Sequence, residues 1–187
     1  MKIFLIECNP KEHSSKESYV QAYVEEAKAK GHEVKMINLY DLNIEYLNFS
    51  GEKPDITLTF ELQQAQDNIL WADQIVFVYS IWWLGIPAIL KAFIDKTFRE
   101  GVVASISKFG PKPLLKGKTA VIMQSYDMPY IGMKSLGDLP MKWWKVVLTK
   151  WCGIKIVKRF DFEMISSVSD KRKQKWINDV KNFVAKL

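Results

Sequence analysis

The sequence predicts an α/β protein built around one parallel β-sheet with helices on both faces. Short apolar runs rich in isoleucine, valine and phenylalanine alternate along the chain with longer segments in which apolar residues recur every three or four positions. No internal repeat or low-complexity stretch interrupts this order. Since parallel strands need crossover connections, which helices usually supply, the alternation favours a sheet covered on both sides.

The first half of the chain holds three expected strands and two expected helices. The strands are KIFLIE (residues 2–7), EVKMINL (33–39) and QIVFVY (74–79). The first helix covers residues 17–30, where tyrosine, valine and alanine recur at helical spacing, and Gly31 follows at a position that favours a helix end. The second helix ends near Trp71, and its apolar stripe comprises Leu58, Leu62, Ala65 and Ile69.

The second half continues the same alternation. Pro87 stands at a favoured first helical position, and the apolar stripe from Ile89 to Phe98 marks the helix that follows. The next expected elements are a strand TAVIMQ (119–124), a helix from Trp143 to Trp151 and a strand IKIVKRFDF (154–162). A closing helix begins after Ser169 or Asp170 and buries Trp176, Val180, Phe183, Val184 and Leu187. The segment from Trp143 to Trp151 carries apolar residues on more than one helix face, which indicates either a subunit interface or a deeply buried helix.

Composition favours a single globular domain over residues 1–187, because 48% of the residues are hydrophobic and 26% are charged. The chain has no run of about 18 uncharged apolar residues and no signal-peptide cleavage pattern at its start, so we expect a cytoplasmic protein without membrane insertion. Cys8 and Cys152 are isolated, and His13 and His32 cannot form a metal cluster with each other at that spacing. We therefore expect neither a disulfide framework nor a metal.

The formal charge of +6 raises the question of an anionic partner. The 27 basic residues are scattered along predicted helical faces and form no run of five or more, which favours solvated helix surfaces over a nucleic-acid interface. Positive charge also attracts small anions, so a nucleotide ligand stays open.

Three loops follow the carboxyl ends of expected strands, where ligands bind in open α/β sheets. They are residues 8–16, 80–86 and 125–132. The first leads into a helix N-terminus, where unpaired N–H groups favour an anion, and it supplies further donors from His13, Ser14, Ser15 and Lys16. It carries neither a GxGxxG nor a GxxxxGK[ST] motif, and the serines could instead simply cap the helix.

The second loop, SIWWLGI, is aromatic where a polar turn would be ordinary. Trp82 and Trp83 offer flat apolar faces that suit a planar ring system, since aromatic contacts add about 0.5–1.5 kcal/mol beyond area burial. The alternative is that both indoles pack into the core or into a subunit interface. Next to a candidate phosphate loop, we favour a ligand.

The segment VFVYSIWWLGIPAILKAFIDKTF resembles the signature of the flavodoxin-like NAD(P)H dehydrogenase (quinone) family. The stretches KGHEVKMINLYDL and FGPKPLLKGKTAVIMQ are similar to further family motifs, so the resemblance covers nearly the whole chain. It implies a flavodoxin-like, five-stranded parallel sheet of order 2-1-3-4-5. It also implies FMN or FAD as cofactor, with FMN favoured by the short chain, NAD(P)H as co-substrate, a quinone or another small aromatic molecule as electron acceptor, and a homodimer.

The resemblance also implies the site residues. Ser14 matches the serine of the family's phosphate loop, and Asn9 stands where the family usually has histidine. The loop that holds the flavin ring in the family comprises Ser80, Ile81, Trp82, Trp83, Leu84 and Gly85 here, with Ser80 in place of the usual proline. After the fourth strand, QSYDMP replaces a T-T-G-G type run, and its expected cofactor contacts are Gln124, Ser125, Tyr126 and Met128. Tyr126 and Tyr130 are the nearby candidates for a catalytic role.

Two other classes share this fold. An electron carrier of the flavodoxin type typically presents an acidic surface, which the charge of +6 disfavours. A flavin-binding ancillary subunit of a membrane transporter with little turnover remains the alternative, because the QSYDMP loop lacks the usual glycines.

Overall fold

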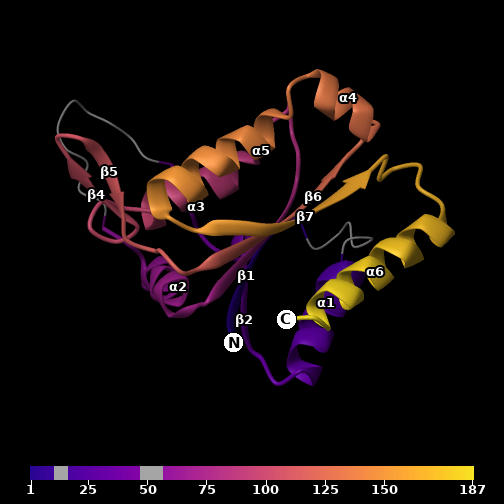
Figure 1. The fold of residues 1–187 in the computed structure, drawn as a ribbon, viewed down its shortest axis with the longest axis horizontal. Helices are drawn as coiled ribbons and strands as arrows, with labels where there is room; N and C mark the ends of the chain where they lie inside the picture. Colours follow the sequence, from indigo (N-terminus) through magenta and orange to yellow (C-terminus); the bar gives the residue numbers. More distant parts are fainter. Residues whose placement is uncertain (11–16, 47–56) are drawn as a thin grey trace.

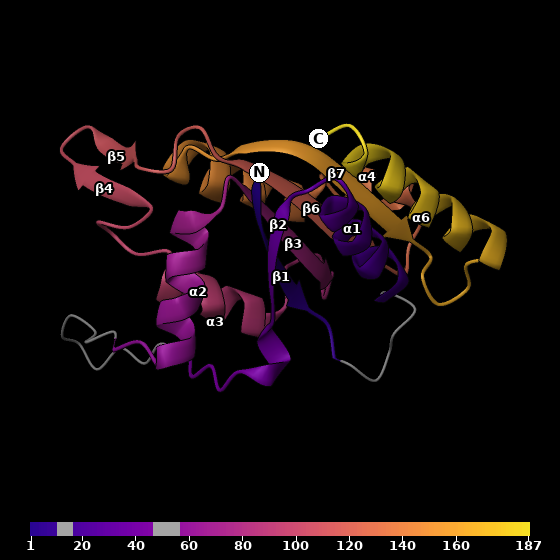
Figure 2. The same ribbon diagram turned by 90° about the horizontal axis from the view of Figure 1, so that it is seen from below.

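The computed structural model describes residues 1–10, 17–46 and 57–187. Its centre is a five-stranded parallel sheet in the order β2-β1-β3-β6-β7, which is the predicted flavodoxin-like order once the short strands β4 and β5 are set aside. The strands of this sheet are β1 (Lys2–Cys8), β2 (Glu33–Asn38), β3 (Gln74–Ser80), β6 (Thr119–Tyr126) and β7 (Lys155–Glu163). Figures 1 and 2 show the sheet between two layers of helices.

One helical layer consists of α1 (Glu17–Ala29) and α6 (Asp170–Val184), which lie side by side (Figure 2). The other contains α2 (Phe60–Trp71), α3 (Ala88–Thr97) and α5 (Leu139–Trp144), together with a π-helix η3 (Lys145–Cys152). A short 3-10 helix η2 (Leu39–Asp41) follows β2. Both faces of the sheet are therefore covered, as the strand and helix alternation predicts.

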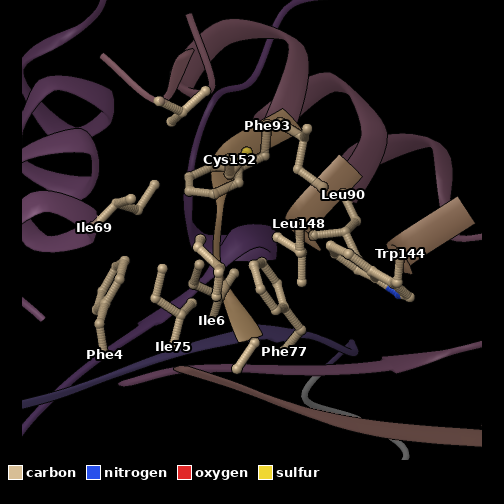
Figure 3. Packing of buried hydrophobic residues seen from close by; sticks show 14 of the residues in the cluster. Phe4, Ile6, Ile69, Ile75, Phe77, Leu90, Phe93, Trp144, Leu148 and Cys152 are labelled. Atoms are coloured by element: carbon tan, nitrogen blue, oxygen red, sulfur yellow. The ribbon is translucent and has the colours of Figure 1, made fainter. Parts of the chain in front are cut away.

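The alternation of side chains along each strand divides the core in two. In β1, Ile3 and Leu5 face the layer of α1 and α6, whereas Phe4 and Ile6 face α2, α3 and η3. Figure 3 shows the second cluster, in which residues of β1 and β3 meet Ile69, Leu90, Phe93, Trp144, Leu148 and Cys152. This packing supports the carboxyl ends of the central strands, where the candidate site lies.

The predicted helix from Trp143 to Trp151 differs from the observed one. Helical structure begins earlier, with α5 at Leu139, and changes to π-helix from Lys145 to Cys152. It ends at Gly153, where φ is +81° and a Cβ atom would lie 2.8 Å from the Cβ of Pro113, so only glycine fits. The sequence pattern marks the apolar stripe but carries no signal for the wider helical turn.

Three further elements were not predicted. The strands β4 (Ala104–Ser107) and β5 (Gly110–Pro113) form an antiparallel hairpin that projects beyond the helical layers (Figure 1). A short helix α4 (Tyr130–Ser135) follows β6. The predicted last strand, residues 154–162, is shifted by one residue in β7, whose pairing with β6 is irregular next to Ala120 and Val121.

Among the described helices, none is both long enough and apolar enough to cross a membrane.

Candidate functional site

The aromatic loop after β3 is a tight reverse turn. Trp82 and Gly85 exchange two backbone hydrogen bonds, of 3.1 Å from the Trp82 N–H and 2.9 Å from the Gly85 N–H. The two central residues are left-handed, with φ of +45° at Trp83 and +60° at Leu84. Bulky residues in this region cost about 1–3 kcal/mol each, and glycine or asparagine is the usual choice. The turn therefore holds these side chains at a cost to stability.

The two indoles of the turn line different pockets. The Trp83 side chain is 97% exposed and lines a pocket of about 340 Å³, whereas Trp82, 66% exposed, lines a separate groove of about 550 Å³ beside Tyr40 and Tyr46. Neither indole is packed in the described core, so packing of both tryptophans into the core is wrong, whereas their packing into a subunit interface stays a prediction.

The pocket beside Trp83 is almost entirely apolar. It is built by the turn after β3, the loop after β6 and the helix α4, and its lining residues are Ile81, Trp83, Leu84, Tyr126, Asp127, Met128, Met133 and Leu136. The backbone N–H of Ile81 donates to the carbonyl of Ser125 at 2.8 Å, which joins the first two walls. The volume is in the ordinary range for small-molecule sites, and the lining suits a flat apolar ring.

Polar side chains gather where the central strands end. The Ser80 hydroxyl lies 3.1 Å from the Ser125 hydroxyl and donates to the side-chain oxygen of Asn9 at 3.4 Å. Asn9 is held in turn by Asn38, whose side-chain amide donates to the Asn9 carbonyl at 3.2 Å. The structure thus brings three of the predicted residues together, at the ends of β1, β3 and β6.

Gln124 is buried below these hydroxyls and belongs to a hydrogen-bond network in the core. Its side-chain oxygen accepts from the Tyr79 hydroxyl at 2.7 Å, and its amide donates to Asp161 at 2.9 Å. The Tyr79 hydroxyl also accepts from the indole N–H of Trp144 at 2.8 Å. Gln124 is fully buried, so its side chain connects β3 to β7 rather than lining the pocket.

Tyr126 lines the pocket, but its hydroxyl donates to Asp161 at 3.1 Å. Burial and the Asp161 carboxylate both raise the pKa of Tyr126 above its ordinary value, because each disfavours the phenolate. Asp161 itself is paired with Arg159, whose Nη2 donates to it at 2.7 Å. The network therefore fixes the Tyr126 ring as a wall and directs its hydroxyl toward β7.

Tyr130 is not among the residues that line the pocket. It begins α4, where its backbone N–H donates to the Glu163 carboxylate, and its ring centre lies 5.5 Å from the guanidinium carbon of Arg159. The predicted phosphate-loop residues His13, Ser14, Ser15 and Lys16 lie outside the described residues. Within the described residues, no group of three or more histidine, cysteine and acidic side chains is arranged to hold a metal.

Sequence reasoning missed three lining residues: Met133 and Leu136, and the charged Asp127. The methionine and the leucine come from α4 and its end, which has only six residues and little periodicity to detect. Pro129, which directly precedes α4, was the available signal, because proline is common at helix starts.

The strand order and the position of the pocket define an α/β protein with an apolar pocket at the carboxyl edge of its sheet, the edge where ligands bind in folds of this class. A family model described as "Flavodoxin-like fold" matches residues 1–187, and the chain belongs to this family.

Two comparisons agree with that family, and a third shows the fold. It is 30% identical to the "FMN-dependent NADH:quinone oxidoreductase 2" of Listeria innocua, over 65% of this chain and 67% of the relative. It resembles the crystal structure of Smu.1420 from Streptococcus mutans UA159, with a TM-score of 0.86 and 29% identity over all of both chains. It also shares the fold of an FMN-dependent NADH-azoreductase from Bacillus anthracis str. Ames Ancestor solved in complex with FMN, with a TM-score of 0.80, 18% identity, and coverage of 99% and 98%.

Proposed function

We propose that this protein is an FMN-dependent oxidoreductase that takes a hydride from NAD(P)H and reduces quinones or similar aromatic acceptors. The observation that carries the proposal is the exposed indole of Trp83, held on a strained turn as one wall of an apolar pocket. The Listeria relative, which is named as an FMN-dependent NADH:quinone oxidoreductase, supports the same reaction.

The residues present fit a flavin. Flat apolar walls from Ile81, Trp83 and Leu84 suit the ring system, and the hydroxyls of Ser80 and Ser125 lie where the strands end. We assign the phosphate to the loop of His13, Ser14, Ser15 and Lys16, with Asn9 beside it. We expect FMN, with FAD as the other option. When bound, the flavin supplies two-electron hydride chemistry, which no protein side chain provides.

The chain's own residues bind and orient the reactants. The apolar side chains of Met128, Met133 and Leu136 would limit the access of water to a bound ring, which would favour hydride transfer. Overall, one NAD(P)H and one proton are consumed for each quinone converted to its hydroquinone. We assign Tyr126 to the wall of the site, because its hydroxyl already donates to Asp161. Tyr130 stays a prediction for proton transfer, and the acceptor turnover of Tyr130→Phe tests it.

Purification without added cofactor tests the proposal. We expect a yellow protein whose absorbance spectrum and released ligand identify FMN, and which oxidises NADH or NADPH only when a quinone is present. A colourless protein that cannot be loaded with FMN or FAD would overturn it. Loaded protein with negligible turnover would instead favour the transporter-subunit alternative, for which the reported relatives provide no support.

We also propose that the protein is a homodimer in the cytoplasm, with residues 1–187 as one domain. Along α5 and η3, Trp144, Leu148 and Cys152 form one buried stripe, whereas Val146 and Trp151 remain 42% and 45% exposed. The hairpin adds the exposed Phe109. These apolar side chains suit an interface between copies. Light scattering that gives the 21.7 kDa monomer at micromolar concentration would remove the dimer.

A further inference from the structure

Among the described residues that line the pocket beside Trp83, Asp127 alone carries a charge. The other lining side chains are aliphatic, aromatic or thioether groups. Asp127 is exposed and lines an otherwise apolar pocket, so its charge lies close to that pocket. A single charge beside an apolar pocket acts on every ligand that enters, because little else there is polar.

The position of this carboxylate is fixed. One oxygen of Asp127 accepts from the backbone N–H of Ser166 at 2.7 Å, which ties the loop after β6 to the segment after β7. The hydrogen bond orients the carboxylate without neutralising it, because a backbone N–H carries no net charge. The other oxygen forms no hydrogen bond or ion pair within the described part of the chain.

The arginines of the neighbouring segments are committed to other acids. Arg159 is paired with Asp161 and with Asp138, and Arg172 is paired with Glu163. Lys134, on α4, lies with its ammonium 5.4 Å from the centre of the Tyr130 ring. No ion pair to Asp127 forms among the described residues, so its negative charge is not neutralised beside the pocket.

We propose that Asp127 makes the pocket selective for uncharged or cationic planar acceptors and against anionic ones. This inference rests on the proposed function and names the class of acceptor that the same site takes. With screening between that of a protein surface and that of bulk water, two unit charges roughly 5–8 Å apart change an equilibrium constant by about five- to tenfold. A sulfonated acceptor is therefore disfavoured by that factor, and the same interaction would be weakened by salt.

A matched pair of quinones tests the proposal in the FMN-loaded protein. The probes are 1,2-naphthoquinone and 1,2-naphthoquinone-4-sulfonate, which share the same ring. The measured quantity is the ratio of kcat/KM for the sulfonate to kcat/KM for the neutral quinone. We expect Asp127→Asn to raise this ratio about five- to tenfold at low ionic strength and Asp127→Lys to raise it further. Because a ratio is compared between variants, the different intrinsic reactivities of the two quinones cancel.

Asp67→Asn is the matched control, since it removes one negative charge at the other end of the molecule. Asp67 is exposed on α2, shortly before the chain enters the amino end of β3, and its substitution should leave the ratio unchanged. Circular dichroism of the Asp127 variants checks that loss of the Ser166 contact has not unfolded the loop region.

Equilibrium binding gives a readout that does not depend on turnover. Calorimetry should show naphthalene-2-sulfonamide, which is neutral, binding more tightly than naphthalene-2-sulfonate, and Asp127→Asn should narrow that difference. Reduction of both quinones with a ratio unchanged by Asp127→Asn would overturn this inference and leave the proposed function intact. Reduction of neither quinone by FMN-loaded protein would overturn the proposed function together with it.

Discussion

Replacing Tyr79 with phenylalanine removes one hydroxyl from the centre of the buried network. Tyr79 is 1% exposed, and its hydroxyl both accepts from the indole N–H of Trp144, at 2.8 Å, and donates to the side-chain oxygen of Gln124, at 2.7 Å. Phenylalanine keeps the ring and its packing but leaves an indole donor and an amide acceptor without partners. Both are fully buried, so water cannot readily replace the lost hydroxyl.

The magnitude follows from these two groups. A buried polar group that loses its partner costs about 1–3 kcal/mol, so we expect Tyr79→Phe to lower the free energy of unfolding by about 2–5 kcal/mol. For a chain of this size, such a loss lowers Tm by roughly 5–15 °C. Urea denaturation of the flavin-free protein measures it without the stabilisation that a bound cofactor adds.

Tyr19 provides a matched control with the opposite expectation. It is 2% exposed, and its hydroxyl has no hydrogen-bond partner in the described part of the chain. Its ring stacks on Phe162 with centres 3.9 Å apart, a contact that phenylalanine retains. Tyr19→Phe should therefore leave stability unchanged or raise it by up to about 1 kcal/mol, because it removes a buried hydroxyl that has no partner among the described residues. Equal losses from both substitutions would refute the reasoning.

Three further predictions concern the turn and the core. Trp83→Ala should weaken FMN binding about threefold to tenfold in a fluorescence titration but leave Tm nearly unchanged, because the side chain is 97% exposed. The free energy of unfolding of Trp83→Gly should be about 1 kcal/mol higher than that of Trp83→Ala, because φ is +45° at this position and glycine adopts a positive φ without strain. Equal unfolding free energies of the two variants in urea would argue against strain in the turn. Burial raises the pKa of the Cys152 thiol from 9.0 to about 12, so the unfolded chain loses this proton first as pH rises. Burial of the protonated thiol therefore contributes fully to the free energy of unfolding below pH 9, and this contribution declines above pH 9. Cys152→Ala should make the decline of the unfolding free energy with pH less steep. An unchanged slope of unfolding free energy against pH would contradict this prediction.

Much of the fold follows from local patterns that the sequence carries openly. The apolar run Ile75–Tyr79 and its counterparts become the central strands, because such runs are stable only where both faces are covered. The hairpin of β4 and β5 escaped prediction, since its strands have only four residues each, are mostly half-buried or exposed, and include Pro111 and Pro113. The π-helix after Trp144 depends on how Leu148 and Cys152 reach the core, and spacing alone does not reveal this.

For the site, the sequence by itself determined that an aromatic loop stands at the end of a buried strand, next to two other loops at the same sheet edge. The physical reason is that parallel strands bring their carboxyl ends together whatever the details of packing. Only the tertiary structure decided that Trp83 and Trp82 line two separate pockets, because the left-handed turn directs the two indoles to different sides. It also decided that Tyr126 turns its hydroxyl away from the pocket, because Asp161 reaches it from a strand 35 residues further along the chain.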